Sequence, residues 1–389
     1  MVLRNAVTGC VMMMLISSCA NEKIVATVSV KNDLNYDREE VVSVDVDDLK
    51  NRIRIGMNAV VKSGNTTAPG QFMDNDADSL ADELVFLASV RAGEQVSFKI
   101  ELSKDEQASP SRSTFSRFVP ERTDDYAWEN DLVAFRTYGP EAQRMAEAGE
   151  KGGTLTSGLD CWLKRVDYPI IDKWYKKYTD GGSYHKDDGE GYDPYHVGKS
   201  RGCGGLGVWK DDSLFVSKNF TQYKKIAEGP VRNIFELTYA PWEGGGTIME
   251  TKRITIDLGS QLYKIEARLN GTNIPNCTIG ITLHDKKGTV STNPALGTFS
   301  YWEPIDDSEI GTGVVISPDK ILSHLDFRTP KKDLSHIYII AKADPVVTYY
   351  TGFAWTKAGK IKTAEAWNKY LESFSEKIQS PMTTKLTWD

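Results

Sequence analysis

The chain has 389 residues, a formal net charge of −7, 40% hydrophobic residues and 26% charged residues, an ordinary composition for a globular protein. Lysine and arginine form no dense run that could follow a phosphate backbone, so the composition argues against nucleic acid as a partner. The length allows one large domain or two smaller ones.

The first 19 residues have the pattern of a bacterial lipoprotein signal peptide. Arg4 provides a positive charge, Val11–Ile16 is a short apolar stretch, and small residues directly precede Cys19. The apolar stretch is too short to span a membrane as a helix. We therefore expect acylation of Cys19 and a lipid anchor, the only membrane contact, at the periplasmic or outer-membrane surface of a Gram-negative bacterium. An ordinary secretory signal with a chance cysteine is the alternative.

Strand patterns begin directly after this segment. Short runs rich in Val, Ile, Thr and Tyr are typical of strands, and they occur at residues 23–32, 40–46, 83–90 and 94–102. Between them, Asp74–Glu83 has the Asp-x-Asp-x-Asp spacing of calcium loops but lacks the central glycine and distal glutamate of an EF-hand. A calcium-stabilised turn and a bare Asx-rich turn both stay open.

The segment from about Phe115 to Val208 interrupts the strand pattern. Long irregular segments of compact domains are usually functional, so we expect a loop region that lies over one face or edge of the fold. In its first part, 117–138, arginines alternate with aromatic residues, which predicts a polar cleft floor along a strand, with cross-strand ion pairing as the alternative. Four candidate substrate contacts come from this part: Arg117, Trp128, Glu129 and Arg136.

Two helical patterns follow, at Glu141–Glu150 and at Leu159–Tyr178. Pro169 lies inside the second pattern and should break or kink it. Lys164 is a further candidate to contact a substrate carboxylate. Three cysteines remain beyond the signal peptide and allow either one disulfide or three buried thiols: Cys161, Cys203 and Cys277.

The irregular stretch "SYHKDDGEGYDPYHVGKSRGCGG", residues 183–205, concentrates side chains that transfer protons or bind metals. Histidine is the side chain best suited to proton transfer near neutral pH. Six side chains could ligate a divalent metal: His185, Asp187, Asp188, Glu190, Asp193 and His196. Their spacing matches no standard metal motif, so a metal site, a metal-free catalytic or sugar-binding loop, and a structural loop all stay open. We predict no required cofactor.

Arg201 ends this stretch among glycines, where the backbone can approach a ligand closely. Its guanidinium suits a carboxylate or sulfate group held by two hydrogen bonds. The alternative is an arginine that supports the loop through backbone carbonyls.

Further strand patterns occupy residues 232–242, 247–259, 262–271, 277–285, 311–317 and 336–343, and Ala364–Ile378 is an amphipathic helix. We therefore predict a mainly β fold, a large antiparallel β-sandwich with a few short helices, formed by residues 20–389 as a single domain. His284 ends one of these strands and could point into a cleft mouth or be buried. No nucleophilic-serine elbow, Walker loop, Rossmann fingerprint or His-Glu-x-x-His motif occurs.

Four stretches resemble the bacterial domain-of-unknown-function family 4861, at residues 74–86, 119–140, 183–214 and 351–374. The resemblance extends from about Ala26 to Leu386. It implies a β-supersandwich like that of galactose mutarotases and several polysaccharide lyases, in a secreted or lipid-anchored protein of Bacteroidetes. Such proteins accompany enzymes that degrade uronic-acid polysaccharides, including the sulfated algal polysaccharide ulvan. A similar member is an oligosaccharide dehydratase, which removes water from a terminal uronic acid to leave a 4,5-unsaturated sugar.

This elimination needs a cation beside the uronate carboxylate, a base for the C5 proton and an acid for the departing C4 hydroxyl. From the available residues we predict four catalytic groups: His185, Tyr195, His196 and Arg201. The remaining predicted substrate contacts, beside the four from 117–138, are Lys164, Tyr184, Asp193 and His284. The predicted partner is an oligosaccharide, and the protein is expected to be a monomer.

Two other functions remain open. A glycoside hydrolase would use a pair of carboxyl groups about 5–10 Å apart. The candidates for such a pair are Glu129, Asp187, Asp188, Glu190 and Asp193. A non-catalytic glycan-binding lipoprotein would instead present an open aromatic platform with few titratable groups.

Overall fold

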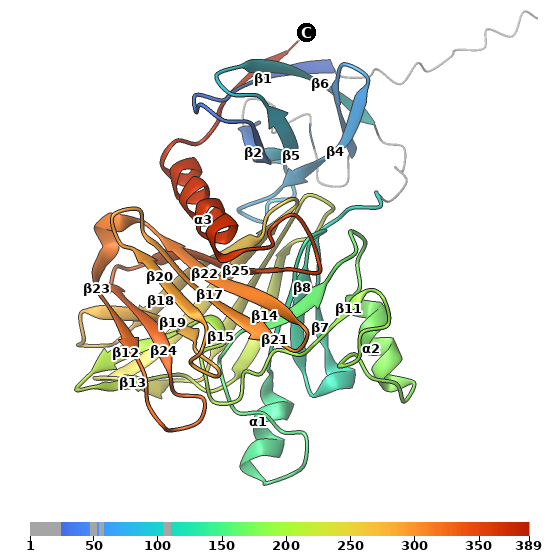
Figure 1. Ribbon diagram of the computed structural model, residues 1–389. Coiled ribbons are helices and arrows are strands. Elements are labelled where there is room, and N and C mark those ends of the chain that lie inside the picture. The colour runs from blue at the N-terminus through green and yellow to red at the C-terminus, as the bar shows by residue number, and fades with distance from the viewer. Residues whose placement is uncertain (1–24, 47–52, 54–57, 104–109, 389) are drawn as a thin grey trace, which may run out of the picture.

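The computed structural model describes residues 25–46, 53, 58–103 and 110–388. The predicted signal peptide, with Arg4 and Cys19, lies outside the described residues. Among the described residues, no helix is long and apolar enough to cross a membrane. Figure 1 shows two β-rich lobes, a smaller N-terminal lobe and a larger body, with helix α3 between them.

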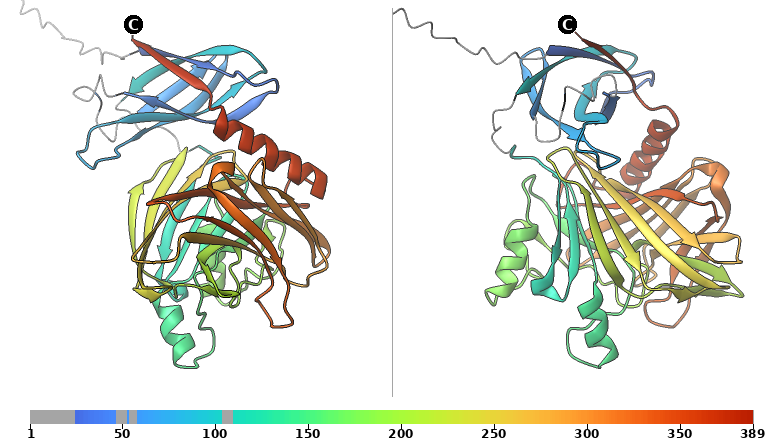
Figure 2. Two further views of the ribbon diagram at one scale, coloured as in Figure 1. Left: turned by 90° about the vertical axis from the view of Figure 1, so that its left-hand side faces the viewer. Right: turned by 180° about the vertical axis from the view of Figure 1, so that it is seen from behind.

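The N-terminal lobe is one curved antiparallel sheet of seven strands, in the order β2-β5-β4-β3-β6-β1-β26. Its strands are β1 (Val25–Lys31), β2 (Arg38–Asp45), β3 (Asn58–Ser63), β4 (Thr66–Met73), β5 (Glu83–Val90), β6 (Gln95–Ser103) and β26 (Thr383–Trp388). The C-terminal strand β26 pairs with β1, with Ala26 opposite Trp388, so both ends of the described chain meet in this lobe. Figure 2 shows this meeting of the two chain ends from two further sides.

The body is a sandwich whose large sheet has the order β14-β15-β17-β18-β25-β22-β21-β20. Its strands are β14 (Phe220–Ala227), β15 (Arg232–Tyr239), β17 (Thr247–Asp257), β18 (Leu262–Asn270), β20 (Thr289–Asn293), β21 (Thr298–Ile305), β22 (Ser308–Ile316) and β25 (Val347–Trp355), and β16 (Trp242–Glu243) pairs with β17. Buried and more exposed residues alternate along β17 and β18, because one face of each strand meets the core.

Two five-stranded sheets oppose the large sheet, in the orders β11-β10-β9-β8-β7 and β13-β12-β19-β24-β23. The first contains β7 (Phe115–Val119), β8 (Asp125–Glu129), β9 (Ala134–Thr137), β10 (Asp160–Lys164) and β11 (Gly191–Tyr192). The second contains β12 (Cys203–Lys210), β13 (Ser213–Phe215), β19 (Asn276–Thr282), β23 (Ile321–Phe327) and β24 (His336–Lys342). A parallel bridge between Leu159 and Gly202 joins the two.

In the described part of the chain, three α-helices and two short 3₁₀ turns complete the fold: α1 (Pro140–Glu147), α2 (Ile171–Thr179), α3 (Ala364–Gln379), η2 (Pro120–Arg122) and η3 (Pro318–Lys320). Helix α3 packs on the body with Trp367 and Leu371, and its N-terminus is capped by the Thr363 hydroxyl, which accepts from the Ala366 N–H. The largest apolar core lies between the sheets of the body, and a second core lies inside the N-terminal lobe.

The predicted mainly antiparallel β-sandwich is confirmed. Two local predictions need correction. The expected helix at Leu159–Tyr178 is a strand, β10, followed by α2, which begins two residues after Pro169. The expected loop region 115–208 is only partly irregular, because it supplies all five strands of one sheet. The prediction that residues 20–389 form a single domain stays a prediction. Helix α3 and strand β26 connect the two lobes.

Candidate functional site

The segment from Ser183 to Ser200 packs against the five-stranded sheets, with Tyr184 on their outer side and Tyr195 and Val197 in the core of the sandwich. Strands β8, β9 and β10 point alternate side chains into the core and outward. Tyr126, Phe135 and Cys161 belong to the core between the sheets. Their neighbours in the chain therefore point outward, toward the segment. Two groups of polar residues form there.

The first group, called the Arg136 cluster, consists of Asp125, Arg136, Asp160 and Asp193. The Arg136 guanidinium donates to Asp160 Oδ2 at 2.7 Å, to Asp193 Oδ2 at 2.7 Å and to the Tyr184 hydroxyl at 2.9 Å, and it lies 3.3 Å from Asp125 Oδ2. No member of the cluster is more than 4% exposed. Three carboxyl groups therefore share one buried guanidinium.

Negative charge exceeds positive charge in the Arg136 cluster. The Oδ1 atoms of Asp125, Asp160 and Asp193 are buried, and no hydrogen-bond partner among the described residues reaches them. Burial raises the pKa of each of these carboxyl groups, although Arg136 opposes the effect, and the pKa of Asp193 is raised well above its ordinary value. The cluster thus retains protons at a pH at which a solvated aspartate would be ionised.

His185 is the accessible group at the rim of this cluster. Its Nδ1 atom lies 2.7 Å from the backbone oxygen of Asp193 and 3.4 Å from Asp193 Oδ2. The side chain is 54% exposed and its ring packs against Tyr184, with the centroids 4.6 Å apart. His185 can therefore exchange protons with solvent while its orientation is held by Asp193.

The second group lines a cavity of about 350 Å³, here called the His284 pocket. Its lining residues are His196, Thr282, Leu283, His284, Asp285, Lys286, Lys331, Lys332, Asp333 and Ser335. They come from the end of β19, the turn after it, the loop before β24 and the segment that carries His196. The predicted residues His196 and His284 thus meet in one pocket, whereas His185 does not line it.

His284 is held with both ring nitrogens close to acceptors. Nδ1 lies 2.5 Å from Glu303 Oε1, and Nε2 lies 2.7 Å from the backbone oxygen of His196, which can only accept. Burial disfavours a charged ring, but the hydrogen bond and charge of Glu303 outweigh it and raise the pKa of His284. The pocket wall therefore contains an imidazolium ion over a wider pH range than a solvated histidine would give.

Beyond its two histidines, the charged lining of the His284 pocket consists of three lysines and two aspartates, Asp285 and Asp333. His196 is 53% exposed, and its Nε2 lies 3.2 Å from Asp333 Oδ1. Lys331 and Lys332 are exposed and form no ion pair within the described part of the chain. Lys286 donates to the backbone oxygen of Thr329. The pocket therefore suits an anionic ligand beside a histidine that can exchange protons.

Tyr195 and Arg201, predicted as catalytic, lie in the interior. Tyr195 is 5% exposed, packs its ring edge-on against His284, and has a buried hydroxyl whose pKa is raised well above its ordinary value by burial. Arg201 is 2% exposed and donates to the hydroxyls of Ser157 at 2.9 Å and Thr156 at 3.2 Å. This placement fits the alternative for Arg201, support of the loop, and gives neither side chain contact with a pocket.

Three of the predicted substrate contacts are also interior residues. Trp128 is fully buried in the core of the sandwich. Glu129 and Lys164 form a buried ion pair of 2.7 Å, and Glu129 also accepts from the backbone N–H groups of Ile170 and Ile171. These bonds satisfy free donors at the start of α2, so the pair has a structural role.

The other predicted side chains of the loop are engaged in ion pairs. Arg117 binds Glu121 at 2.6 Å and Asp172 at 2.5 Å. The acids of the loop have cationic partners, in the pairs Asp187–Arg165, Asp188–Lys177 and Glu190–Lys173. Asp188 and Glu190 line one further cavity together with Tyr184, each of the two acids bound to a lysine, and the Tyr184 hydroxyl accepts from Arg136.

The sequence did not indicate four important residues: Asp160, Glu303, Lys331 and Lys332. Asp160 lay in a pattern that predicted a helix. Glu303 lies within a strand and belongs to no local motif. Lys331 and Lys332 stand in an ordinary polar loop, far along the chain from His196. The only local signal was their density of charge beside Asp333.

A cation site is geometrically available elsewhere. Among the described residues, Asp74, Asp76 and Asp78 are the one group of three or more potential ligands whose atoms all lie within 4.8 Å of one another, and oxygen ligands of this kind suit calcium. The six predicted metal ligands of residues 183–205 do not form such a group. The Arg136 cluster fails as a metal site because the guanidinium lies among its carboxyl groups.

The model of a family described as "Domain of unknown function (DUF4861)" matches residues 30–384. "Uncharacterized protein P7" of Formosa agariphila is 40% identical over 384 residues, and the match covers 96% of each chain. Two solved structures from Enterococcus faecalis, a protein in glycosyl hydrolase family 38 and an alpha-mannosidase, are 11% and 10% identical with TM-scores of 0.48 and 0.41. The match covers 93% of this chain in both cases but 47% and 46% of those proteins, so the chain spans about half their length.

Proposed function

The chain belongs to the DUF4861 family, and on this premise we propose that it is a carbohydrate-active enzyme, a carbon–oxygen lyase of uronic-acid oligosaccharides. It removes water from the terminal uronic acid of polysaccharide fragments such as those of ulvan. The observation that carries the proposal is the His284 pocket, where the exposed His196 lies beside three lysines and beside His284, whose pKa is raised by Glu303. This combination meets the two demands of the reaction, charge neutralisation and proton transfer.

Charge neutralisation comes first in the chemistry. A proton next to a uronate carboxylate is weakly acidic, because its removal places a second negative charge beside the first. Cations fixed around the carboxylate stabilise that developing charge. Lys331, Lys332 and the His284 imidazolium supply positive charge in the pocket, and the ammonium groups of both lysines are exposed.

Proton transfer is assigned to His196. Asp333 binds its Nε2 atom at 3.2 Å, so Nδ1 is the atom available to the substrate. The C5–H bond breaks and its proton passes to Nδ1, the electron pair forms the C4=C5 double bond, and the C4–O bond breaks. His196 then returns the proton to the departing oxygen, which leaves as water. One histidine can serve both steps when the C5 hydrogen and the C4 hydroxyl lie on the same face of the sugar.

The experiment is an assay with saturated oligosaccharides that end in a uronic acid. Elimination conjugates the new double bond with the carboxylate, so the product absorbs in the ultraviolet, where the substrate does not. Release of reducing sugar without this absorbance would overturn the proposal in favour of hydrolysis. Binding without either product would favour a non-catalytic glycan-binding protein.

We also propose that Cys19 carries a lipid anchor that holds the enzyme at the periplasmic or outer-membrane surface. Metabolic labelling with a fatty acid should mark the wild-type chain and leave Cys19→Ser unmarked. Labelling of both chains, or of neither, would contradict the anchor.

A further inference from the structure

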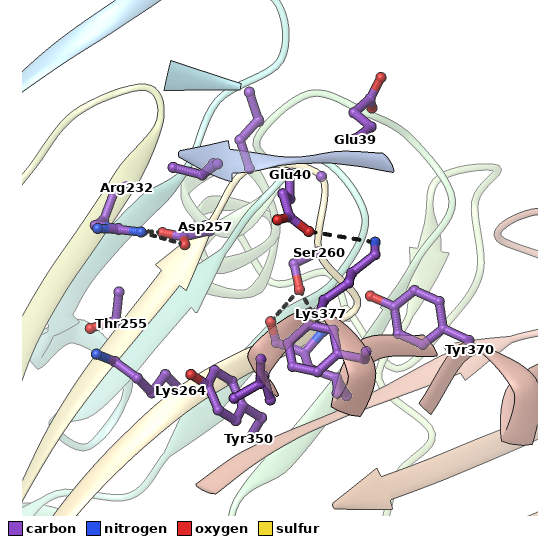
Figure 3. A pocket seen from close by; sticks show the side chains of 16 residues that line it. Glu39, Glu40, Arg232, Thr255, Asp257, Ser260, Lys264, Tyr350, Tyr370 and Lys377 are labelled. Atoms are coloured by element: carbon purple, nitrogen blue, oxygen red, sulfur yellow. Dashed lines mark hydrogen bonds and ion pairs between the residues drawn. The ribbon is translucent and has the colours of Figure 1, made fainter. Parts of the chain in front are cut away.

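A second cavity, of about 320 Å³, lies where the N-terminal lobe, the large sheet and α3 meet (Figure 3). It is called the interlobe pocket here. Glu39 and Glu40 reach it from β2, Tyr350 from β25, and Phe374 and Lys377 from α3. It shares no lining residue with the His284 pocket. Its volume is at the lower end of the range of small-molecule sites, which often lie between domains.

Most charges of the interlobe pocket are already neutralised. Arg232 binds Asp257 through two hydrogen bonds of 2.6 and 2.7 Å, and Glu40 binds Arg38 at 2.5 Å. Glu39 is half-exposed and accepts from the Ser89 hydroxyl at 3.0 Å. These pairs leave the walls polar but with little free charge.

Lys377 is the exception. Its side chain is only 21% exposed, and the nearest carboxylate recorded for it, that of Glu40, is 3.8 Å from Nζ. This distance is too long for a hydrogen bond. Burial lowers the pKa of Lys377 and the charge of Arg38 acts in the same direction, while the carboxylates of Glu40 and Glu39 oppose the shift. Among the described residues, the ammonium group thus has the Glu40 carboxylate as an ion-pair partner but no recorded hydrogen bond, and an anionic ligand would supply one.

Aromatic rings form the apolar part of the same pocket. Tyr350 and Phe374 meet edge to face with centroids 5.1 Å apart, and Tyr370 is held by the Gln261 N–H, which donates to its hydroxyl at 3.0 Å. Rings fixed in this way offer a rigid apolar surface to the C–H face of a sugar ring. A uronic acid unit has both features that these walls would bind, an anionic group on one side and an apolar face on the other.

We propose that the interlobe pocket is a second, non-catalytic carbohydrate site that binds a uronic acid unit, with its carboxylate on Lys377 and its apolar face on Tyr350 and Phe374. The choice of a uronic acid as ligand rests on the proposed function, whereas the pocket and the long ion pair of Lys377 do not. These contacts lie on α3 and β25, away from the His284 pocket, so the site would hold an oligosaccharide on the protein independently of that pocket.

The test measures binding of the methyl glycoside of a hexuronic acid by calorimetry. The full chain carries His196→Ala, so that the probe is not consumed. Adding Lys377→Gln should weaken binding about tenfold, the effect of one charge-assisted hydrogen bond. Lys377→Arg should retain binding, and Lys369→Gln, an exposed lysine of the same helix, should behave as the parent. The neutral methyl hexoside should bind equally weakly to all variants.

Equal affinity of the parent and Lys377→Gln chains would overturn the second site. So would binding that is lost only when Lys331 and Lys332 are replaced, because the probe would then occupy the His284 pocket. The proposed function is tested separately by the ultraviolet assay of the wild-type chain. A chain that forms no unsaturated product but loses probe binding with Lys377→Gln keeps the second site and not the lyase activity.

Discussion

Replacement of Arg136 by methionine removes the one cation that lies among three buried carboxyl groups. Methionine fills a similar volume and carries no charge, so the change isolates the electrostatic role. Asp160 and Asp193 each lose a hydrogen bond of 2.7 Å. With water excluded from the site, the cluster can relieve the uncompensated charge by taking up a proton.

The expected loss of folding stability follows from the free energy needed to bind that proton. An aspartate has a pKa near 3.9 in the unfolded chain, and each pH unit is worth about 1.36 kcal/mol, so one added proton costs about 4 kcal/mol at pH 7. The same proton costs about 1.5 kcal/mol at pH 5. The value at pH 7 agrees with the loss of about 3–5 kcal/mol that usually follows removal of one partner from a buried ion pair. Because the folded-state pKa is raised, stability falls as the pH rises from about 4 toward that pKa.

Urea unfolding followed by tryptophan fluorescence and circular dichroism at pH 5 and pH 7 measures both quantities. The matched control is Arg144→Met on α1, whose guanidinium pairs with Glu141 and Glu150 at the surface and whose loss should leave the midpoint unchanged. An Arg136→Met chain with the wild-type midpoint at pH 7 would refute the reasoning. A deficit of the same size at both pH values would show that the loss is one of packing and not of charge.

Two further predictions concern the His284 pocket. His196→Ala should lower kcat for elimination by about 10²–10⁴-fold, the usual contribution of a general acid–base group, whereas His185→Ala should retain most of the activity; equal losses in the two variants would contradict the assignment of proton transfer to His196. Glu303→Gln should lower the pKa of His284, so that the pocket loses the imidazolium charge, and activity with it, at a lower pH than the wild type. The pH dependence of kcat/KM and a proton NMR titration of the His284 ring measure this shift. An unchanged alkaline limb of the kcat/KM profile would exclude the charged ring from the reaction.

The fold could largely be predicted because period-two patterning shows directly in the strands. The runs at 247–259 and 262–271 became β17 and β18 because alternation with a buried face is a local property. The pattern failed at Asp160–Lys164, where all five residues are buried and the alternation is absent. A strand covered on both faces cannot be told from a helix segment by periodicity alone. Pro169 did mark the true boundary before α2.

The site was harder to predict, because its residues meet through pairing of distant strands. His196 and His284 were both indicated by the sequence, and they share the His284 pocket. Arg201 shows the opposite case. An arginine among glycines suggested contact with a ligand. The same glycines, however, allow the chain to fold tightly around the Arg201 side chain. Gly280 leaves room for the aliphatic part of that side chain. Exposure is a property of the tertiary structure, which local composition does not determine.

The two polar groups of the outer face are mechanically connected. Asp193 is fixed on Arg136, and His196 follows it by three residues, a span of at most about 11 Å of extended chain. The backbone oxygen of His196 also accepts from His284. The segment is thus held at both ends by buried charges, which keeps a histidine on an irregular loop in one orientation. Arg136→Met should therefore slow elimination even at temperatures at which the variant is fully folded, although Arg136 lines neither pocket. If the folded variant keeps the wild-type kcat, the Arg136 cluster stabilises the fold without positioning His196.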